Sequence, residues 1–180
     1  LSAQRADKIV LFVGNEFLRK GMDYLREAIP MVVDQVPDAR FIVVGENADH
    51  YELEGHPNLE LTGLISDVEA LKNLYRTASV FVLPHRFERA GHVIIEAMTA
   101  GLPIVTSNQG GPPEVVKEGV NGFVMEIGDV NKLAESLITL LQNPDLVRAF
   151  GESSKQIAAD GYLWGNIADK MLDCIVGDLH

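Results

Sequence analysis

Cysteine is almost absent from this 180-residue sequence, which contains one cysteine and one tryptophan. The lone Cys174 excludes an internal disulfide and a cysteine metal cluster. Basic residues are also scarce: 15 Lys and Arg face 26 Asp and Glu, and the net charge of −11 argues against a nucleic-acid partner. No hydrophobic run approaches the roughly 20 residues of a membrane span, and no signal peptide is visible. We therefore expect a cytoplasmic protein.

The composition fits one globular domain that spans residues 1–180. Apolar residues make up 47% of the chain and charged residues 23%, and the length suffices for one well-buried core. Leu1 opens the chain in place of methionine, so we expect a processed or excised piece of a longer protein. Short apolar runs predict six strands, covered on both faces: Ile9–Gly14, Arg40–Gly45, Leu59–Thr62, Val80–Pro84, Pro103–Thr106 and Gly122–Met125.

Segments with helical spacing alternate with these strands. They predict helices at Met22–Gln35, Asp67–Thr77, His92–Ala100, Pro113–Glu118, Val130–Leu141, Pro144–Ala159 and around Ile167–Val176. Such alternation predicts an α/β fold, a doubly wound and mostly parallel six-stranded sheet with helices on both faces and right-handed crossovers. Ligands of these sheets bind at the carboxyl ends of the strands, near the point where the strand order reverses.

The stretch from Val82 to Val105 carries the most specific signal. A strand runs into a loop with Glu88, a helix begins near Gly91, and Glu96 follows on that helix. This junction directs unpaired backbone N–H groups and the positive end of a helix dipole at one point, which suits a phosphate. Carboxylates accept strong hydrogen bonds from hydroxyls, which suits a sugar. A nucleotide-sugar combines both groups; the alternative is two solvated charges beside an ordinary turn.

Several motifs resemble the donor-binding half of GT-B retaining glycosyltransferases of the GT4 type. The resemblance runs from Lys8 to about Cys174 and depends on the order and spacing of the motifs together. They are the Glu88-x7-Glu96 pair and the segments 12–21, 97–105, 110–114, 118–123, 129–135 and 143–145.

The resemblance implies a phosphate grip near the first strand. Gly14 follows that strand, and Lys20 matches the family lysine that holds the donor diphosphate. Asn15 stands where the family usually has an arginine, and Arg19 is the candidate to replace it. A lysine reaches a diphosphate as a point charge, whereas an arginine grips it bidentately. The alternative for Arg19 and Lys20 is a pair of solvated charges.

The resemblance also implies roles for residues in and around the strand-loop-helix junction between Val82 and Val105. Glu88 would bind the hydroxyls of the donor sugar, and Glu96 the ribose hydroxyls. The amides of Gly91, His92 and Val93 would hold the distal phosphate. The loop with Ile65 would meet the edge of the base through backbone groups.

The implied chemistry is electrostatic. Cleavage of the anomeric bond leaves negative charge on the diphosphate, which Lys20, Arg19 and the helix amides would stabilise. No metal ligand cluster is apparent in the sequence, so we expect no metal and no cofactor beyond the nucleotide-sugar substrate. The resemblance implies retention at the anomeric carbon, with Glu88 positioning the sugar and not acting as a covalent nucleophile. Glu88 and Lys20 are therefore the predicted catalytic residues.

A GT-B enzyme binds its acceptor on a second, N-terminal domain, for which this chain has no room. We therefore expect the isolated chain to bind donor without transferring sugar. We also expect that the isolated chain can form a homodimer. We expect that the full-length protein can associate peripherally with a membrane through the missing half. The motifs are shared by branches that use UDP-glucose, UDP-N-acetylglucosamine, GDP-mannose and ADP-glucose, and we favour a UDP-linked hexose.

Two other classes remain in view. A dinucleotide-binding oxidoreductase is disfavoured because no Gly-x-Gly-x-x-Gly follows the first strand. A non-catalytic nucleotide-sugar-binding or regulatory module would keep the same pocket without the chemistry, and the sequence leaves it open.

Overall fold

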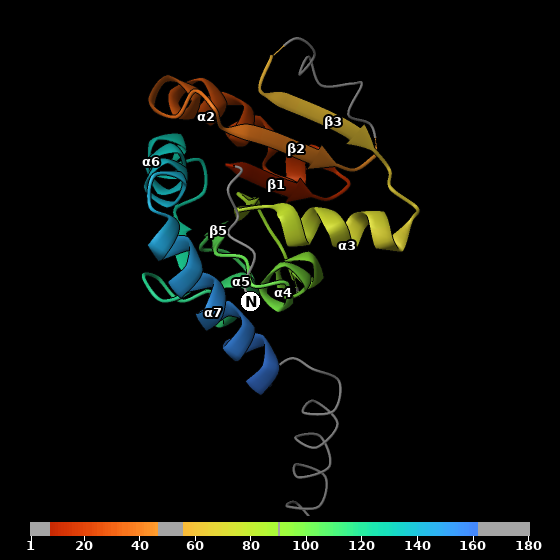
Figure 1. Cartoon of the computed structure of the whole chain (residues 1–180), viewed down its shortest axis with the longest axis vertical. Helices are drawn as coiled ribbons and strands as arrows, with labels where there is room; N and C mark the ends of the chain where they lie inside the picture. Colours follow the sequence, from red (N-terminus) through yellow and green to blue (C-terminus); the bar gives the residue numbers. More distant parts are fainter. Residues whose placement is uncertain (1–7, 47–55, 90, 162–180) are drawn as a thin grey trace, which may run out of the picture.

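A single parallel sheet forms the centre of the molecule (Figure 1). The computed structural model describes residues 8–46, 56–89 and 91–161. Six strands, all paired in parallel, lie in the order β3-β2-β1-β4-β5-β6. Their bounds are β1 (Ile9–Val13), β2 (Arg40–Val44), β3 (Leu59–Gly63), β4 (Val80–Leu83), β5 (Ile104–Ser107) and β6 (Gly122–Met125). The predicted fold class is confirmed, with each strand within one residue of its expected bounds.

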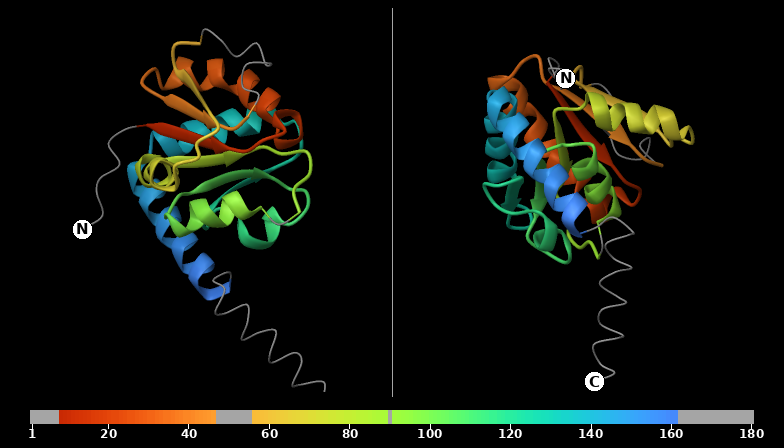
Figure 2. Two further views of the ribbon diagram at one scale, coloured as in Figure 1. Left: turned by 90° about the vertical axis from the view of Figure 1, so that its right-hand side faces the viewer. Right: turned by 60° about the horizontal axis from the view of Figure 1, so that its bottom comes forward.

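Helices cover both faces of this sheet. They are α1 (Phe17–Lys20), α2 (Met22–Gln35), α3 (Val68–Thr77), α4 (His92–Thr99), α5 (Pro112–Val115), α6 (Val130–Leu141) and α7 (Pro144–Gly161). The views in Figures 1 and 2 place α2 and α6 on one face and α3 and α4 on the other. Helix α7 packs against α4 and α6. The chain order reverses between β1 and β4, so the carboxyl ends of these two central strands flank the expected ligand position.

The core explains why these segments form central strands. Every residue of β1, β4 and β5 is buried, as expected for strands covered by helices on both faces. The edge strand β3 has no fully buried residue. The central strands are therefore a rigid base for the loops at their carboxyl ends.

The sequence predictions need two corrections, and one predicted helix is not tested. Residues 17–20 form the short helix α1, whereas we expected a loop there. Periodicity cannot reveal a single turn, and α1 begins after Glu16, a non-glycine residue with a positive φ of 57°. Helix α5 covers Pro112–Val115 and ends before Val116, which is already extended, so the predicted Pro113–Glu118 is too long. The helix predicted around Ile167–Val176 lies outside the described residues.

The structure also bears on the expectation that no segment is long and hydrophobic enough to span a membrane. In the part of the chain that the structure describes, every helix is too short or too polar to span a bilayer.

Candidate functional site

A pocket of about 280 Å³ opens at the carboxyl ends of β1 and β2, beside the N-terminus of α4. The pocket is lined by Val13, Gly14, Asn15, Glu16, Arg19, Lys20, Val44, Gly45, Leu64, Ile65, Leu71 and Val93. Gly14, Asn15, Arg19, Lys20, Ile65 and Val93 were predicted as site residues. The structure thus brings together segments that lie up to 79 positions apart in the sequence, between Gly14 and Val93.

The predicted site residues Glu88, Gly91, His92 and Glu96 do not line this pocket, but Glu88 is paired with Lys20, which does. Nζ of Lys20 donates a hydrogen bond to Oε2 of Glu88, which joins α1 to the loop after β4. Both side chains are largely buried, with 11% and 12% of their surface exposed. Burial raises the pKa of Glu88, but the hydrogen bond from Lys20 and the charges of Lys20 and Arg19 outweigh it, so the pKa lies below its usual value. The Glu88 carboxylate is therefore ionised at neutral pH.

Arg19 lies beside this pair but is held by other groups. Its Nε and Nη2 donate to the two carboxylate oxygens of Glu16 at 2.9 and 3.1 Å. Its Nη1 donates to the carbonyl of Phe87 at 3.0 Å and lies 3.4 Å from Oε2 of Glu88. The hydrogen bonds that Arg19 donates to Glu16 raise the pKa of Arg19 above its usual value. A phosphate would have to compete with Glu16 for this guanidinium.

Asn15 has a structural contact of its own. Its side-chain oxygen accepts a hydrogen bond of 2.9 Å from the backbone N–H of Glu46. This contact ties the loop after β1 to the end of β2. Asn15 is thus placed at the pocket as predicted, but it supplies no positive charge there.

The loop that carries Glu88 is fixed through its backbone. The carbonyl of Glu88 accepts from the N–H of Gly111 at 3.0 Å. Gly110 has a φ of +74°, and a Cβ there would lie 1.9 Å from the carbonyl oxygen of Glu88. A side chain at position 110 would therefore displace this loop.

Helix α4 presents its N-terminus beside the pocket. Gly91 precedes the helix in the left-handed region, at φ 59°, and no side chain caps this end. The first helical bonds run from Ile94 and Ile95 to the carbonyl of Gly91, so the N–H groups of His92 and Val93 lie ahead of them. His92 is exposed, and Val93 forms part of the pocket wall. These two N–H groups precede the first helical hydrogen bond of α4, and their binding to an anion stays a prediction.

Glu96 lies one turn further along α4 and is exposed, whereas Ile94, Ala97 and Met98 are buried. From the helical spacing of Val93, Ile94, Ala97 and Met98 we expected Glu96 to face the ligand cleft; Glu96 points away from the core but is not among the residues that line the pocket. Its Oε2 accepts a hydrogen bond of 2.8 Å from the hydroxyl of Tyr75.

Comparison with known proteins identifies the family. A model of glycosyl transferases group 1 matches residues 2–157. The chain belongs to this family. It is 31% identical over 179 residues to spore coat protein SA of Bacillus subtilis, in an alignment that covers 92% of the chain and 48% of that relative. The chain therefore spans about half the length of the curated relatives it matches.

Solved structures agree with the family assignment. WaaG, a glycosyltransferase involved in lipopolysaccharide biosynthesis, matches with a TM-score of 0.78 and 28% identity over 95% of this chain and 47% of its own. HepE of Anabaena, solved in complex with UDP-glucose, gives a TM-score of 0.80 over 96% of this chain and 49% of its own. At 22% identity, HepE shows the fold alone. The predicted family, GT-B glycosyltransferases, is confirmed.

Two features of this glycosyltransferase domain escaped the sequence predictions. Arg86 forms a two-pronged pair with Asp23, at 2.8 and 2.6 Å, and its guanidinium lies 4.3 Å from the ring centre of Tyr24. This contact fastens α2 to the loop that carries Glu88. The other feature is Tyr75, whose hydroxyl reaches Glu96 from α3. Both contacts join segments that are distant in the sequence, so no local sequence pattern predicts them.

His85 lies fully buried at the end of β4, three residues before Glu88. Neither of its ring nitrogens has a hydrogen-bond partner among the described residues. Burial lowers the pKa of His85 to about 4, with Lys20 and Arg19 adding to the effect and Glu88 opposing it. The imidazole is therefore neutral at pH 7.

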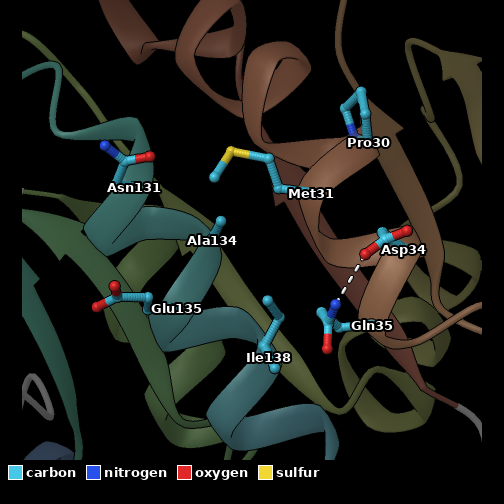
Figure 3. A pocket seen from close by; sticks show the side chains of 8 residues that line it. All are labelled: Pro30, Met31, Asp34, Gln35, Asn131, Ala134, Glu135 and Ile138. Carbon is cyan, nitrogen blue, oxygen red and sulfur yellow. Dashed lines mark hydrogen bonds between the residues drawn. The ribbon is translucent and has the colours of Figure 1, made fainter.

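A second, larger pocket lies far from these groups. It has a volume of about 680 Å³ and lies between α2 and α6 (Figure 3), where its walls include Met31, Asp34, Glu135 and Ile138. None of the predicted site residues lines it. Across the described ranges 8–46, 56–89 and 91–161, no three His, Cys, Asp or Glu side chains gather as a metal site.

Proposed function

We propose that this chain is the donor-binding half of a retaining glycosyltransferase that moves a hexose from a nucleotide-diphosphate sugar to a saccharide or lipid-linked acceptor. The Lys20–Glu88 contact beside the N-terminus of α4 is the observation that carries the proposal. It sets a cation and a carboxylate beside the N-terminus of α4, next to the pocket that Lys20 and Val93 line. This combination matches a ligand with both phosphates and hydroxyls.

In this proposal Lys20 and the amides of Gly91, His92 and Val93 bind the diphosphate. They stabilise the negative charge that develops when the anomeric carbon–oxygen bond breaks. Glu88 accepts hydrogen bonds from the hydroxyls of the donor sugar and holds it against the leaving group. Arg19 contributes positive charge from its place beside Glu88 while it stays paired with Glu16. No metal is required, because these fixed charges already face the phosphates.

The nucleoside would occupy the rest of the pocket. Gly14 allows its backbone to approach the phosphates closely, Asn15 keeps the adjoining loop in place, and Ile65 lies in the loop after β3 that would meet the base. Glu96 would accept hydrogen bonds from the ribose. We favour a UDP-linked hexose, and the nucleotide titration described below tests that choice.

The acceptor would bind to a second domain outside this chain. The half-length match to the curated relatives supports this division of labour. We propose that the isolated domain binds donor without transferring sugar, and that any contact with a membrane surface is made by the other half.

Calorimetric titration of the chain with UDP, GDP, ADP and their hexose conjugates tests the proposal. We expect one base to bind, and Lys20→Ala and Glu96→Ala each to weaken binding about tenfold or more, as for a lost charged hydrogen bond. The matched controls Lys72→Ala and Glu135→Ala remove exposed charges away from the pocket and should bind like the parent. Equal loss in the controls, or no binding by the parent chain or the full-length protein, would refute a donor site.

A further inference from the structure

We propose that Tyr75 is a positioning residue of the donor site, which holds the Glu96 carboxylate in place for the ribose hydroxyls. The inference rests on the proposed function, because it takes Glu96 as the ribose ligand. It adds a residue on α3, a helix from which no site residue was predicted.

The contact itself has the features of a rigid support. Tyr75 is 5% exposed, and its hydroxyl donates to Oε2 of Glu96 at 2.8 Å. Its ring lies 6.0 Å, centre to centre, from that of Phe81 on the central strand β4. Burial, followed by the nearby charge of Glu96, raises the pKa of Tyr75 above its usual value, so the phenol keeps its proton. A fixed donor therefore faces an exposed carboxylate.

The position of the pair relates it to the pocket. Leu71 on α3 and Val93 on α4 both line the pocket wall. Tyr75 lies four residues after Leu71, and Glu96 lies three residues after Val93, so each is the next residue along the same helix face. The hydrogen bond between Tyr75 and Glu96 therefore lies one helical turn beyond the pocket-lining residues Leu71 and Val93, and it joins α3 to α4 there.

The chemical benefit is preorganisation. A glutamate on an exposed helix turn has several rotatable bonds, and ordering it at the moment of binding costs affinity. The bond from Tyr75 fixes one carboxylate oxygen and leaves Oε1, together with the other lone pair of Oε2, to accept from hydroxyls. A hydroxyl at position 75 is therefore expected to sharpen recognition of ribose without touching the nucleotide.

The test compares Tyr75→Phe with the parent chain in calorimetric titrations with UDP and 2′,3′-dideoxy-UDP. If the nucleotide screen selects guanine or adenine, GDP or ADP and its 2′,3′-dideoxy analogue replace these two compounds. Phenylalanine keeps the ring packed against Phe81 and removes the hydroxyl alone. Tyr24→Phe makes the same change on α2 and serves as the control.

In the parent chain we expect UDP to bind more tightly than the dideoxy compound. In Tyr75→Phe we expect the UDP affinity to fall about three- to tenfold while dideoxy-UDP binding stays the same, as for a weakened charged hydrogen bond. Adding Tyr75→Phe to Glu96→Ala should cause no further loss. Tyr24→Phe should keep the parental ratio.

Two outcomes overturn the inference and can be told apart. An unchanged UDP to dideoxy-UDP ratio in Tyr75→Phe, in a parent that binds both, assigns Tyr75 a purely structural role and leaves the donor site standing. The absence of binding by the parent to any of the nucleotides removes the proposed function, and the inference with it.

Discussion

Nζ of Lys20 donates directly to Oε2 of Glu88, so helix α1 and the loop after β4 are joined by an ion pair beside the pocket. The two residues lie 68 positions apart in the chain. In the proposed reaction they bind opposite ends of the bond that breaks, Lys20 the phosphate and Glu88 the sugar. Their contact therefore marks where the anomeric bond would lie.

Replacing Lys20 with methionine should raise the pKa of Glu88, because burial then acts on the carboxylate with less opposing charge. Stability should fall by about 1–3 kcal/mol through the unpaired, largely buried carboxylate. Carboxyl-resolved NMR titration and urea unfolding measure both effects. Lys72→Met removes an exposed pair on α3 and should cost less than about 0.5 kcal/mol. A Glu88 titration curve unchanged by Lys20→Met would show that the contact has no electrostatic effect.

Gly110→Ala should damage the site through backbone contact. A Cβ at Gly110 would lie 1.9 Å from the carbonyl oxygen of Glu88. Gly119 also has a positive φ, of +71°, but a Cβ there would meet nothing within 4 Å. Both alanine variants therefore strain the backbone by about 1–3 kcal/mol, and we expect nucleotide binding and Glu88 amide shifts to change in Gly110→Ala alone. Equal effects in both would argue that the loop does not depend on this close approach.

Glu88→Ala in the full-length protein separates an enzyme from a binding module. We expect sugar transfer to fall about a hundredfold or more, because a group that acts in the transition state is lost. Affinity for the nucleotide without its sugar should change little. Release of nucleotide from the sugar conjugate measures transfer, and Glu135→Ala is the control. A full-length parent that binds donor and never transfers it would establish the non-catalytic module.

The stability of the chain should fall between pH 6.5 and 4. The pKa of His85 is lowered to about 4 in the folded chain, whereas the unfolded chain has an ordinary histidine pKa of about 6.5. The unfolded state therefore takes up a proton first as the pH falls, which costs at most about 3 kcal/mol. His85→Leu should flatten this part of the stability curve in chemical denaturation, with His92→Leu as the control. A slope equal to that of the parent would place the acid sensitivity elsewhere.

The sequence predicts those parts of the fold whose cause is local. Strands β1 and β4 are continuous apolar runs, and the structure buries every residue of both. Helix α1 was missed because it has four residues and begins after a left-handed glutamate, which no periodicity reveals. Local patterns thus define the frame more reliably than the loops on it.

The candidate site divides in the same way. The position of Lys20 and Val93 at one pocket follows from parallel strands that carry their loops at one edge. The hydrogen bonds of Arg19 to Glu16 and of Tyr75 to Glu96 depend on side-chain rotamers and on where the fold places α3 relative to α4. Those contacts arise from tertiary structure, so the motifs alone could not predict them.

Amide chemical-shift mapping during titration with UDP, GDP and ADP tests the central claim most directly, because it compares the two pockets described above. The account predicts that one nucleotide shifts the amides of Gly14, Ile65, His92 and Val93, while Met31 and Ile138 in the larger pocket between α2 and α6 stay unchanged. Shifts concentrated between α2 and α6, or none with any nucleotide, would contradict a donor site at the carboxyl ends of the strands.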